Sequence, residues 1–154
     1  MTISRIDHVG INTSDFARAL GFYRDLLGLR VLAESTHSDP EIAVLLGLES
    51  VELHIADLDS GDGRVVELIE YIRPKGTQVA YRLYDTPITH IAFTVDDLGA
   101  VRERLVAAGV GVISRHSVAI HDPGGAFDGA TCLYLKGPDG VILELVQRRP
   151  RDVT

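Results

Sequence analysis

The chain has 154 residues, the length of one domain, and its 45% hydrophobic content is enough for a real core. A net charge of −7 argues against nucleic acid or an anionic membrane as the main partner, because both are bound through clustered Lys and Arg. The single cysteine, Cys132, excludes an intrachain disulfide, and the sequence shows no signal-peptide pattern and no apolar run long enough to span a bilayer. We therefore expect a globular cytoplasmic protein.

The first half of the chain predicts a strand, a helix and three further strands. In residues 5–12 apolar and polar positions alternate, and His8 shares its face with small or polar neighbours, which indicates a face that lines a cavity. A helix follows, capped by Ser14 and ended by Gly28, with an apolar stripe formed by Phe16, Leu20, Tyr23 and Leu27. Further strands are expected near 29–33, 51–57 and 64–72, and a linker at 73–87.

The second half repeats this order. A strand at 88–95 precedes a helix capped by Asp96 and Gly109, with a stripe formed by Leu98, Val101, Leu105 and Ala108. Strands are expected near 110–114, 130–136 and 141–147. Residues 6–31 align with 88–112 with one gap, so the halves are an internal repeat. The sequence predicts one domain, 1–154, with modules at about 1–72 and 88–148.

Four residues at matching positions of the repeat are candidate metal ligands. The alignment places His8 on His90, and Glu67 and Glu144 each follow an Asp-Gly turn at the same spacing. Two nitrogen and two oxygen donors suit a borderline divalent cation. Any one of these residues alone is more often structural. Glu144 is the strongest member, because it lies in the apolar stretch VILELV, where an unpaired carboxylate is costly to bury.

Glu70 is the rival of Glu67 on the same predicted strand. It lies three residues further on, so strand parity sends its side chain to the opposite face, and the repeat matches it with Gln147. We therefore prefer Glu67. The remaining histidines have no counterpart in the other half, which favours structural roles for His37, His54, His116 and His121.

Five stretches carry a family resemblance: IDHVGI, ALGFYRDLLGL, VVELIEYIRPKG, ITHIAFTVDDLGAV and GPDGVILELVQ. Together they resemble the vicinal oxygen chelate superfamily, which includes glyoxalase, methylmalonyl-CoA epimerase, extradiol dioxygenases, and fosfomycin and bleomycin resistance proteins. The resemblance implies an α+β fold, in which paired βαβββ modules form a curved, cup-shaped mixed sheet with helices outside. It also implies one divalent cation (Co, Ni, Mn, Zn or Fe), a small substrate with adjacent oxygens, and a homodimer. The halves of one site would come from one chain or from two.

The four-ligand set resembles the glyoxalase and epimerase branches. This implies a metal-dependent isomerase, epimerase or lyase that removes a proton next to a metal-chelated carbonyl, with Glu144 or Glu67 as base. Epimerases of this family usually have glutamine where this chain has Glu67. An extradiol-type iron dioxygenase and a resistance-type protein that only binds its ligand are the alternatives. Substrate contacts are expected from Tyr71, Arg82, Tyr84, Phe127 and Tyr134.

Overall fold

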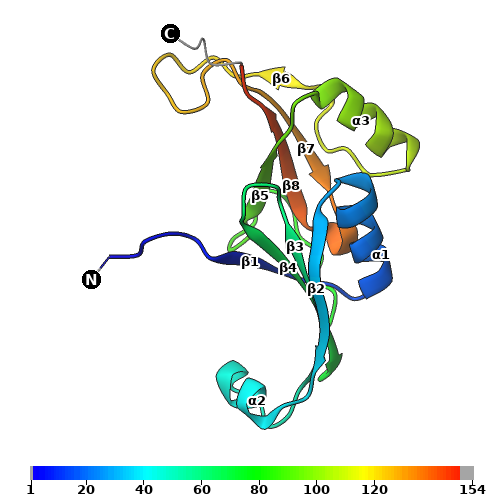
Figure 1. The fold of residues 1–154 in the computed structure, drawn as a ribbon. Coiled ribbons are helices and arrows are strands. Elements are labelled where there is room, and N and C mark those ends of the chain that lie inside the picture. Colours follow the sequence, from blue (N-terminus) through cyan, green and yellow to red (C-terminus); the bar gives the residue numbers. More distant parts are fainter. Residues whose placement is uncertain (1, 150–154) are drawn as a thin grey trace. The chain divides into compact units, whose positions relative to one another are not determined.

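The protein consists of two compact units, which divide between Val79 and Ala80 (Figure 1). Our computed structural model describes residues 2–149. Each unit contains a four-stranded sheet with both parallel and antiparallel pairs. Within the described residues, no helix is long and apolar enough to cross a membrane.

The first unit starts with a strand and a helix, and three strands complete its sheet. Its elements are β1 (His8–Asn12), α1 (Phe16–Gly21), a π-helical turn (Phe22–Leu26), β2 (Arg30–His37), α2 (Pro40–Leu46), β3 (Glu52–Asp59) and β4 (Val65–Arg73). The strand order is β1-β4-β3-β2. Strand β1 runs parallel to β4, and the other pairs are antiparallel.

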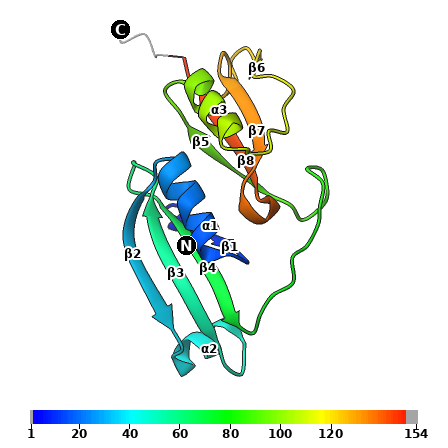
Figure 2. The ribbon, with the colours of Figure 1, turned by 90° about the vertical axis from the view of Figure 1, so that its right-hand side faces the viewer.

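The second unit has the same topology. Its elements are β5 (His90–Thr94), α3 (Leu98–Ala107), β6 (Val118–Ala119), β7 (Thr131–Lys136), a 3-10 turn (Pro138–Gly140) and β8 (Ile142–Gln147). The strand order is β5-β8-β7-β6, and β5 is parallel to β8. Figure 2 shows α1 and α3 each lying over one face of the sheet in their own unit. The prediction of an α+β fold with two βαβββ-like modules is confirmed.

Both predicted helix starts are wrong by one residue. The N-caps are Asp15 and Asp97, not Ser14 and Asp96, and their carboxylates accept the backbone N–H groups of Arg18 (3.0 Å) and Ala100 (2.9 Å). An aspartate in extended backbone can accept a free N–H of the first helical turn. The N-cap is therefore the second residue of Ser14-Asp15 and of Asp96-Asp97.

The predicted glycines follow the helical segments: Gly28 comes two residues after the π-helical turn that continues α1, and Gly109 two residues after α3. Gly28 has φ of 83° and Gly109 φ of 76°, the left-handed conformation that glycine adopts without strain.

Two further elements differ from the expectation. The strand predicted near 110–114 is reduced to an isolated bridge between Val112 and Leu135, and β6 forms later in the chain. Helix α2 was not predicted. It begins with Pro40 after Asp39 and ends at Gly47, and it is too short to show a clear helical periodicity.

One face of each sheet packs against the helix of its own unit, and in β8 the residues of both faces are buried from Ile142 to Val146. Residues at alternate positions of the strands are buried towards the helix, including Leu58, Leu68, Leu133, Leu143 and Leu145, none of which is exposed. The predicted alternation in the first strand of each half is confirmed. In β1, His8, Gly10 and Asn12 are exposed, whereas Ile11 is buried. Since the candidate histidines lie on the opposite face from the core, they are accessible to a ligand.

Candidate functional site

The first unit brings His8 and Glu67 together on neighbouring parallel strands. Gly10 pairs with Glu67, and His8 lies two residues before Gly10, so both side chains are on one face. The His8 Nε2 atom is 4.0 Å from Glu67 Oε2. A Cβ atom at Gly10 would come 3.5 Å from the Ile69 side chain and 3.9 Å from Glu67 Oε2. Both are ordinary contact distances, so a Cβ atom would fit here as it does at Ala92, the matching position of the second unit.

Acidic side chains surround His8. Its Nδ1 atom is 3.2 Å from Asp7 Oδ1, and this hydrogen bond is the main reason why the pKa of His8 is raised. The charges of Glu67 and Asp57 raise the pKa further, while partial burial lowers it. The sequence reasoning missed Asp57, which lies directly opposite Glu67 on β3. Only the strand register reveals it, because it has no acidic counterpart in the repeat.

The second unit brings His90 and Glu144 together in the matching register. Ala92 pairs with Glu144 as Gly10 pairs with Glu67, and His90 lies two residues before Ala92. The His90 Nε2 atom is 3.2 Å from Glu144 Oε2. The side chain of Glu144 is only 10% exposed, compared with 25% for Glu67. A carboxylate with so little contact with water needs donors or a cation nearby.

Tyr134 lies directly opposite Glu144 on β7. Its hydroxyl donates to Glu144 Oε2 at 3.1 Å and lies 3.3 Å from His90 Nε2. Burial, together with the charge of Glu144, raises the pKa of Tyr134 to about 12, so the hydroxyl keeps its proton at neutral pH. Tyr134 was predicted as a substrate contact, and the structure places it beside both candidate ligands of this unit.

Cys132 lies near Glu144 and is on β7, the strand that carries Tyr134. It is a free, buried cysteine two residues before Tyr134. Burial, together with its interaction with Glu144, raises the pKa of the thiol to about 11. The thiol is therefore neutral at physiological pH and is a poor nucleophile.

Glu70 lies on the opposite face of β4 from Glu67, as strand parity predicts. It pairs with His54, whose ring stacks on Phe16 of α1 with the centroids 3.6 Å apart. The His54 Nε2 atom is 2.9 Å from Glu34 Oε1. This cluster packs under the helix of the first unit, so a structural role fits Glu70 and His54.

The remaining predicted substrate contacts are distributed over three places. Tyr71 packs against the apolar cluster formed by Ala43, Val51 and Leu53 beside α2. The Arg82 guanidinium lies over the Tyr84 ring at 4.8 Å and donates to Asp85 at 2.7 Å.

The third place is the 120–130 segment, where Phe127 lies 4.5 Å beneath the guanidinium of Arg148. In the described residues, these contacts join Arg82 and Phe127 to their own neighbours and not to His90 or Glu144. Their assignment as substrate contacts remains a prediction.

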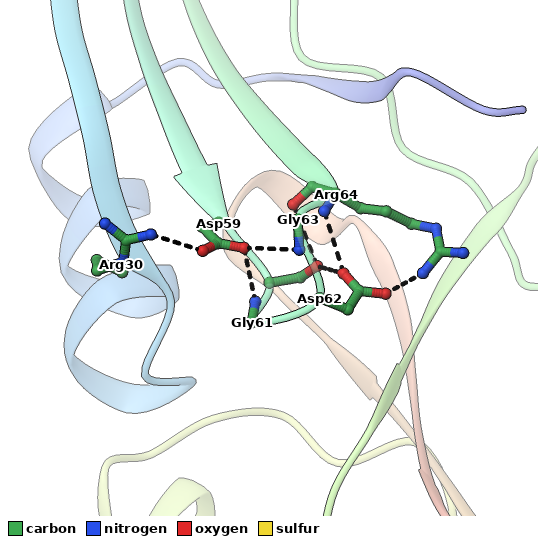
Figure 3. Close-up of polar contacts among 7 residues, drawn as sticks. Arg30, Asp59, Gly61, Asp62, Gly63 and Arg64 are labelled. Atoms are coloured by element: carbon green, nitrogen blue, oxygen red, sulfur yellow. Dashed lines mark hydrogen bonds and ion pairs between the residues drawn. The ribbon is translucent and has the colours of Figure 1, made fainter.

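The turn between β3 and β4 fixes the start of the strand that carries Glu67 (Figure 3). Asp59 Oδ1 accepts the backbone N–H groups of Gly61 (2.8 Å) and Gly63 (3.2 Å), and Asp59 Oδ2 pairs with Arg30 at 2.8 Å. The Gly61 hydrogen bond, followed by Arg30, holds the pKa of Asp59 below its usual range. Gly63 has φ of 79°, which confirms the predicted tight turn.

The donor chemistry of each unit fits a divalent cation. Each sheet aims one imidazole nitrogen and one carboxylate oxygen at the same place, and these donors suit Mn, Co, Ni, Zn or Fe. Within residues 2–149, no three His, Cys, Asp or Glu side chains gather into a group that could hold a metal ion. The full ligand set of His8, Glu67, His90 and Glu144 draws one pair from each unit and remains a prediction.

Curated relatives match nearly the whole chain. A probable lactoylglutathione lyase of Vibrio cholerae is 27% identical over 151 residues, which cover 97% of this chain and 94% of the relative. A lactoylglutathione lyase of Haemophilus influenzae is 29% identical over 146 residues, with 94% and 93% coverage.

Solved structures share the fold. A glyoxalase family protein from Bacillus cereus superposes with a TM-score of 0.81 at 20% identity, covering 96% of this chain and 95% of its own. The fosfomycin resistance protein FosX of Listeria monocytogenes, solved with Mn(II) and sulfate, gives 0.62 at 17% identity, with 96% and 95% coverage. The family described as the Glyoxalase/Bleomycin resistance protein/Dioxygenase superfamily matches residues 5–145. The predicted family is thus confirmed, and the chain belongs to this superfamily.

Proposed function

We propose that the chain binds one divalent cation through His8, Glu67, His90 and Glu144, and that it acts as an isomerase, epimerase or lyase on a carbon next to a carbonyl. One observation carries this proposal. Each unit presents an imidazole–carboxylate pair on its first and last strands, and the strand register is the same in both units. Two chance pairs would not be expected to coincide in this way.

A cation at these donors would supply Lewis-acid stabilisation of negative charge on a substrate oxygen, which is worth several kcal/mol. We further propose that the two units belong to one domain, and that each unit supplies half of the ligands of a site. The halves of a site come from one chain or from the two chains of a homodimer. The partner in either case is a small molecule with adjacent oxygens.

Glu144 is the base in this proposal. Its carboxylate is nearly buried beside His90, and its surroundings exclude most of the water that would compete for the substrate proton. Proton removal by a positioned carboxylate contributes about 100-fold or more to a rate. Glu67 is the alternative base, and it is more exposed.

The curated relatives support a thioester substrate. A probable lactoylglutathione lyase and a lactoylglutathione lyase match nearly the full length of this chain, and S-lactoylglutathione is a thioester with a hydrogen on the carbon next to its carbonyl. S-lactoylglutathione is therefore the first probe. Basic side chains could bind the carboxylates of glutathione, but Arg73 and Arg82 are both paired with acids, Glu52 and Asp85.

The test is proton exchange in deuterated water. Metal-loaded protein should introduce deuterium at the carbon next to the thioester carbonyl of S-lactoylglutathione, measured by mass spectrometry or proton NMR. Glu144→Gln keeps an oxygen donor and removes the base, so exchange should fall about 100-fold. Glu70→Gln is the matched control, because Glu70 lies on the other face of its sheet.

The other outcomes separate the alternatives. Retained exchange in metal-loaded Glu144→Gln would move the base to Glu67. Oxygen uptake without exchange on catechol substrates would replace the proposal with a dioxygenase. Ligand binding without exchange or oxygen uptake would indicate a resistance-type binding protein.

A further inference from the structure

The two imidazole–carboxylate pairs differ in how firmly they are held. In the first unit the residue opposite Glu67 is Asp57, and the His8–Glu67 distance is 4.0 Å. In the second unit the residue opposite Glu144 is a tyrosine, and the His90–Glu144 distance is 3.2 Å. An ionised aspartate can only accept hydrogen bonds, whereas a tyrosine can donate one.

The Tyr134 hydroxyl lies within reach of both His90 and Glu144. Its hydroxyl has one proton, which it donates to Glu144 Oε2 at 3.1 Å. The hydroxyl oxygen lies 3.3 Å from His90 Nε2 and accepts from it only in the tautomer that carries the ring proton on Nε2, a proton that a bound cation would replace. The His90 ring meets the Tyr134 ring edge to face, with centroids 5.2 Å apart, which restricts the imidazole further.

Glu144 depends on this contact more than Glu67 would. Its side chain is 10% exposed, so water can satisfy little of the carboxylate. Its described neighbours along β8 are apolar and buried: Ile142, Leu143, Leu145 and Val146. The donors come from β7, with the Tyr134 hydroxyl and the Cys132 thiol both interacting with the carboxylate. The Glu144 carboxylate thus contacts side chains outside the ligand set as well as His90.

We infer that Tyr134 is a positioning residue, which holds Glu144 and His90 in the arrangement that a cation requires before the cation binds. This inference rests on the proposed metal site and adds that its two ligand pairs differ in how far they are positioned before the cation binds. The His90–Glu144 pair is preorganised, whereas in the first pair Asp7 holds only His8 and the Glu67 carboxylate adjusts. Residues that orient metal ligands typically change affinity about 10-fold to 100-fold when removed.

The test is the affinity of metal-free protein for Co²⁺, measured by calorimetry and by the visible spectrum of the bound ion. Tyr134→Phe removes only the hydroxyl and should weaken binding about tenfold or more. Tyr81→Phe is the matched control, because it deletes in the same unit a hydroxyl that donates to the Gly140 carbonyl at 2.9 Å. Tyr81→Phe should bind Co²⁺ like the wild type.

A merely structural tyrosine would change the free energy of unfolding and leave Co²⁺ affinity unchanged, which would overturn the inference. Equal weakening in Tyr81→Phe would also overturn it. The His90→Ala variant separates the role of Tyr134 from the existence of the metal site. Lost binding in His90→Ala with unchanged binding in Tyr134→Phe would overturn the inference alone, whereas unchanged binding in His90→Ala would overturn the metal site together with it.

A second measurement leaves the sequence intact and serves if Tyr134→Phe fails to fold. Protein labelled with 3-fluorotyrosine should shift the fluorine resonance of Tyr134 on addition of Zn²⁺, while the resonance of Tyr81 stays in place. Phe variants of the other tyrosines supply the assignment. A Tyr134 resonance that does not respond to bound Zn²⁺ would contradict the inference.

Discussion

Cys132 should make the metal-free protein less stable at alkaline pH. The thiol is buried beside Glu144, and its pKa is raised from 9.0 to about 11. Above about pH 9 the unfolded chain releases this proton while the folded chain retains it, so the folded state loses stability as pH rises. Between about pH 7.5 and about pH 10.5 this single group should remove about 2 kcal/mol of unfolding free energy, because a pKa difference of one between the folded and unfolded chains corresponds to about 1.36 kcal/mol.

The assay is urea unfolding at these two pH values, followed by circular dichroism, with chelator and reductant present. Cys132→Ser is the variant of choice, because a serine hydroxyl can still donate to Glu144 and does not titrate in this range. The lysines contribute equally to both proteins, and the charge of Cys132 is the smallest of the causes that raise the pKa of Tyr134. The wild type should therefore lose about 2 kcal/mol more than Cys132→Ser between the two pH values. Equal losses would show that the folded chain does not hold the thiol proton and would refute the reasoning.

Three further predictions concern the fold and the ligand set. Asp97→Ala should lower the unfolding free energy by about 1 kcal/mol by removing the cap of α3, whereas Asp96→Ala should change it little, as measured in urea. Leu133→Ala should cost about 2–5 kcal/mol, because the side chain is fully buried in the second sheet. Glu67→Ala should weaken Co²⁺ binding by about tenfold or more, and Glu70→Ala should leave it unchanged, in calorimetric titrations.

The internal repeat made most of the architecture predictable. Matching histidines and Asp-Gly turns set the order of elements in both halves, and strand parity placed Glu67 and Glu70 on opposite faces. Helix α2 and the shift of β6 escaped prediction for a physical reason. Helix α2 has seven residues, and β6 has two, so neither shows a full period of apolar residues.

The site was predictable only in part. Sequence symmetry singled out the histidines and glutamates as candidate ligands, and the apolar residues around Glu144 made it the strongest candidate. The partners of these residues depend on register between strands that are distant in the sequence. Asp57 opposite Glu67, and Cys132 beside Glu144, could be identified only once β3 had paired with β4 and β7 with β8. For the same reason Tyr134 could be proposed as a pocket residue but not as the hydrogen-bond partner of Glu144.

The central claim is one divalent cation held by His8, Glu67, His90 and Glu144. Elemental analysis of protein purified without chelator tests it most directly, with wild type, His8→Ala, His90→Ala and the double variant prepared in parallel. The account predicts about one transition-metal ion per chain in the wild type and its loss in the variants. Full metal occupancy in the double variant would contradict it.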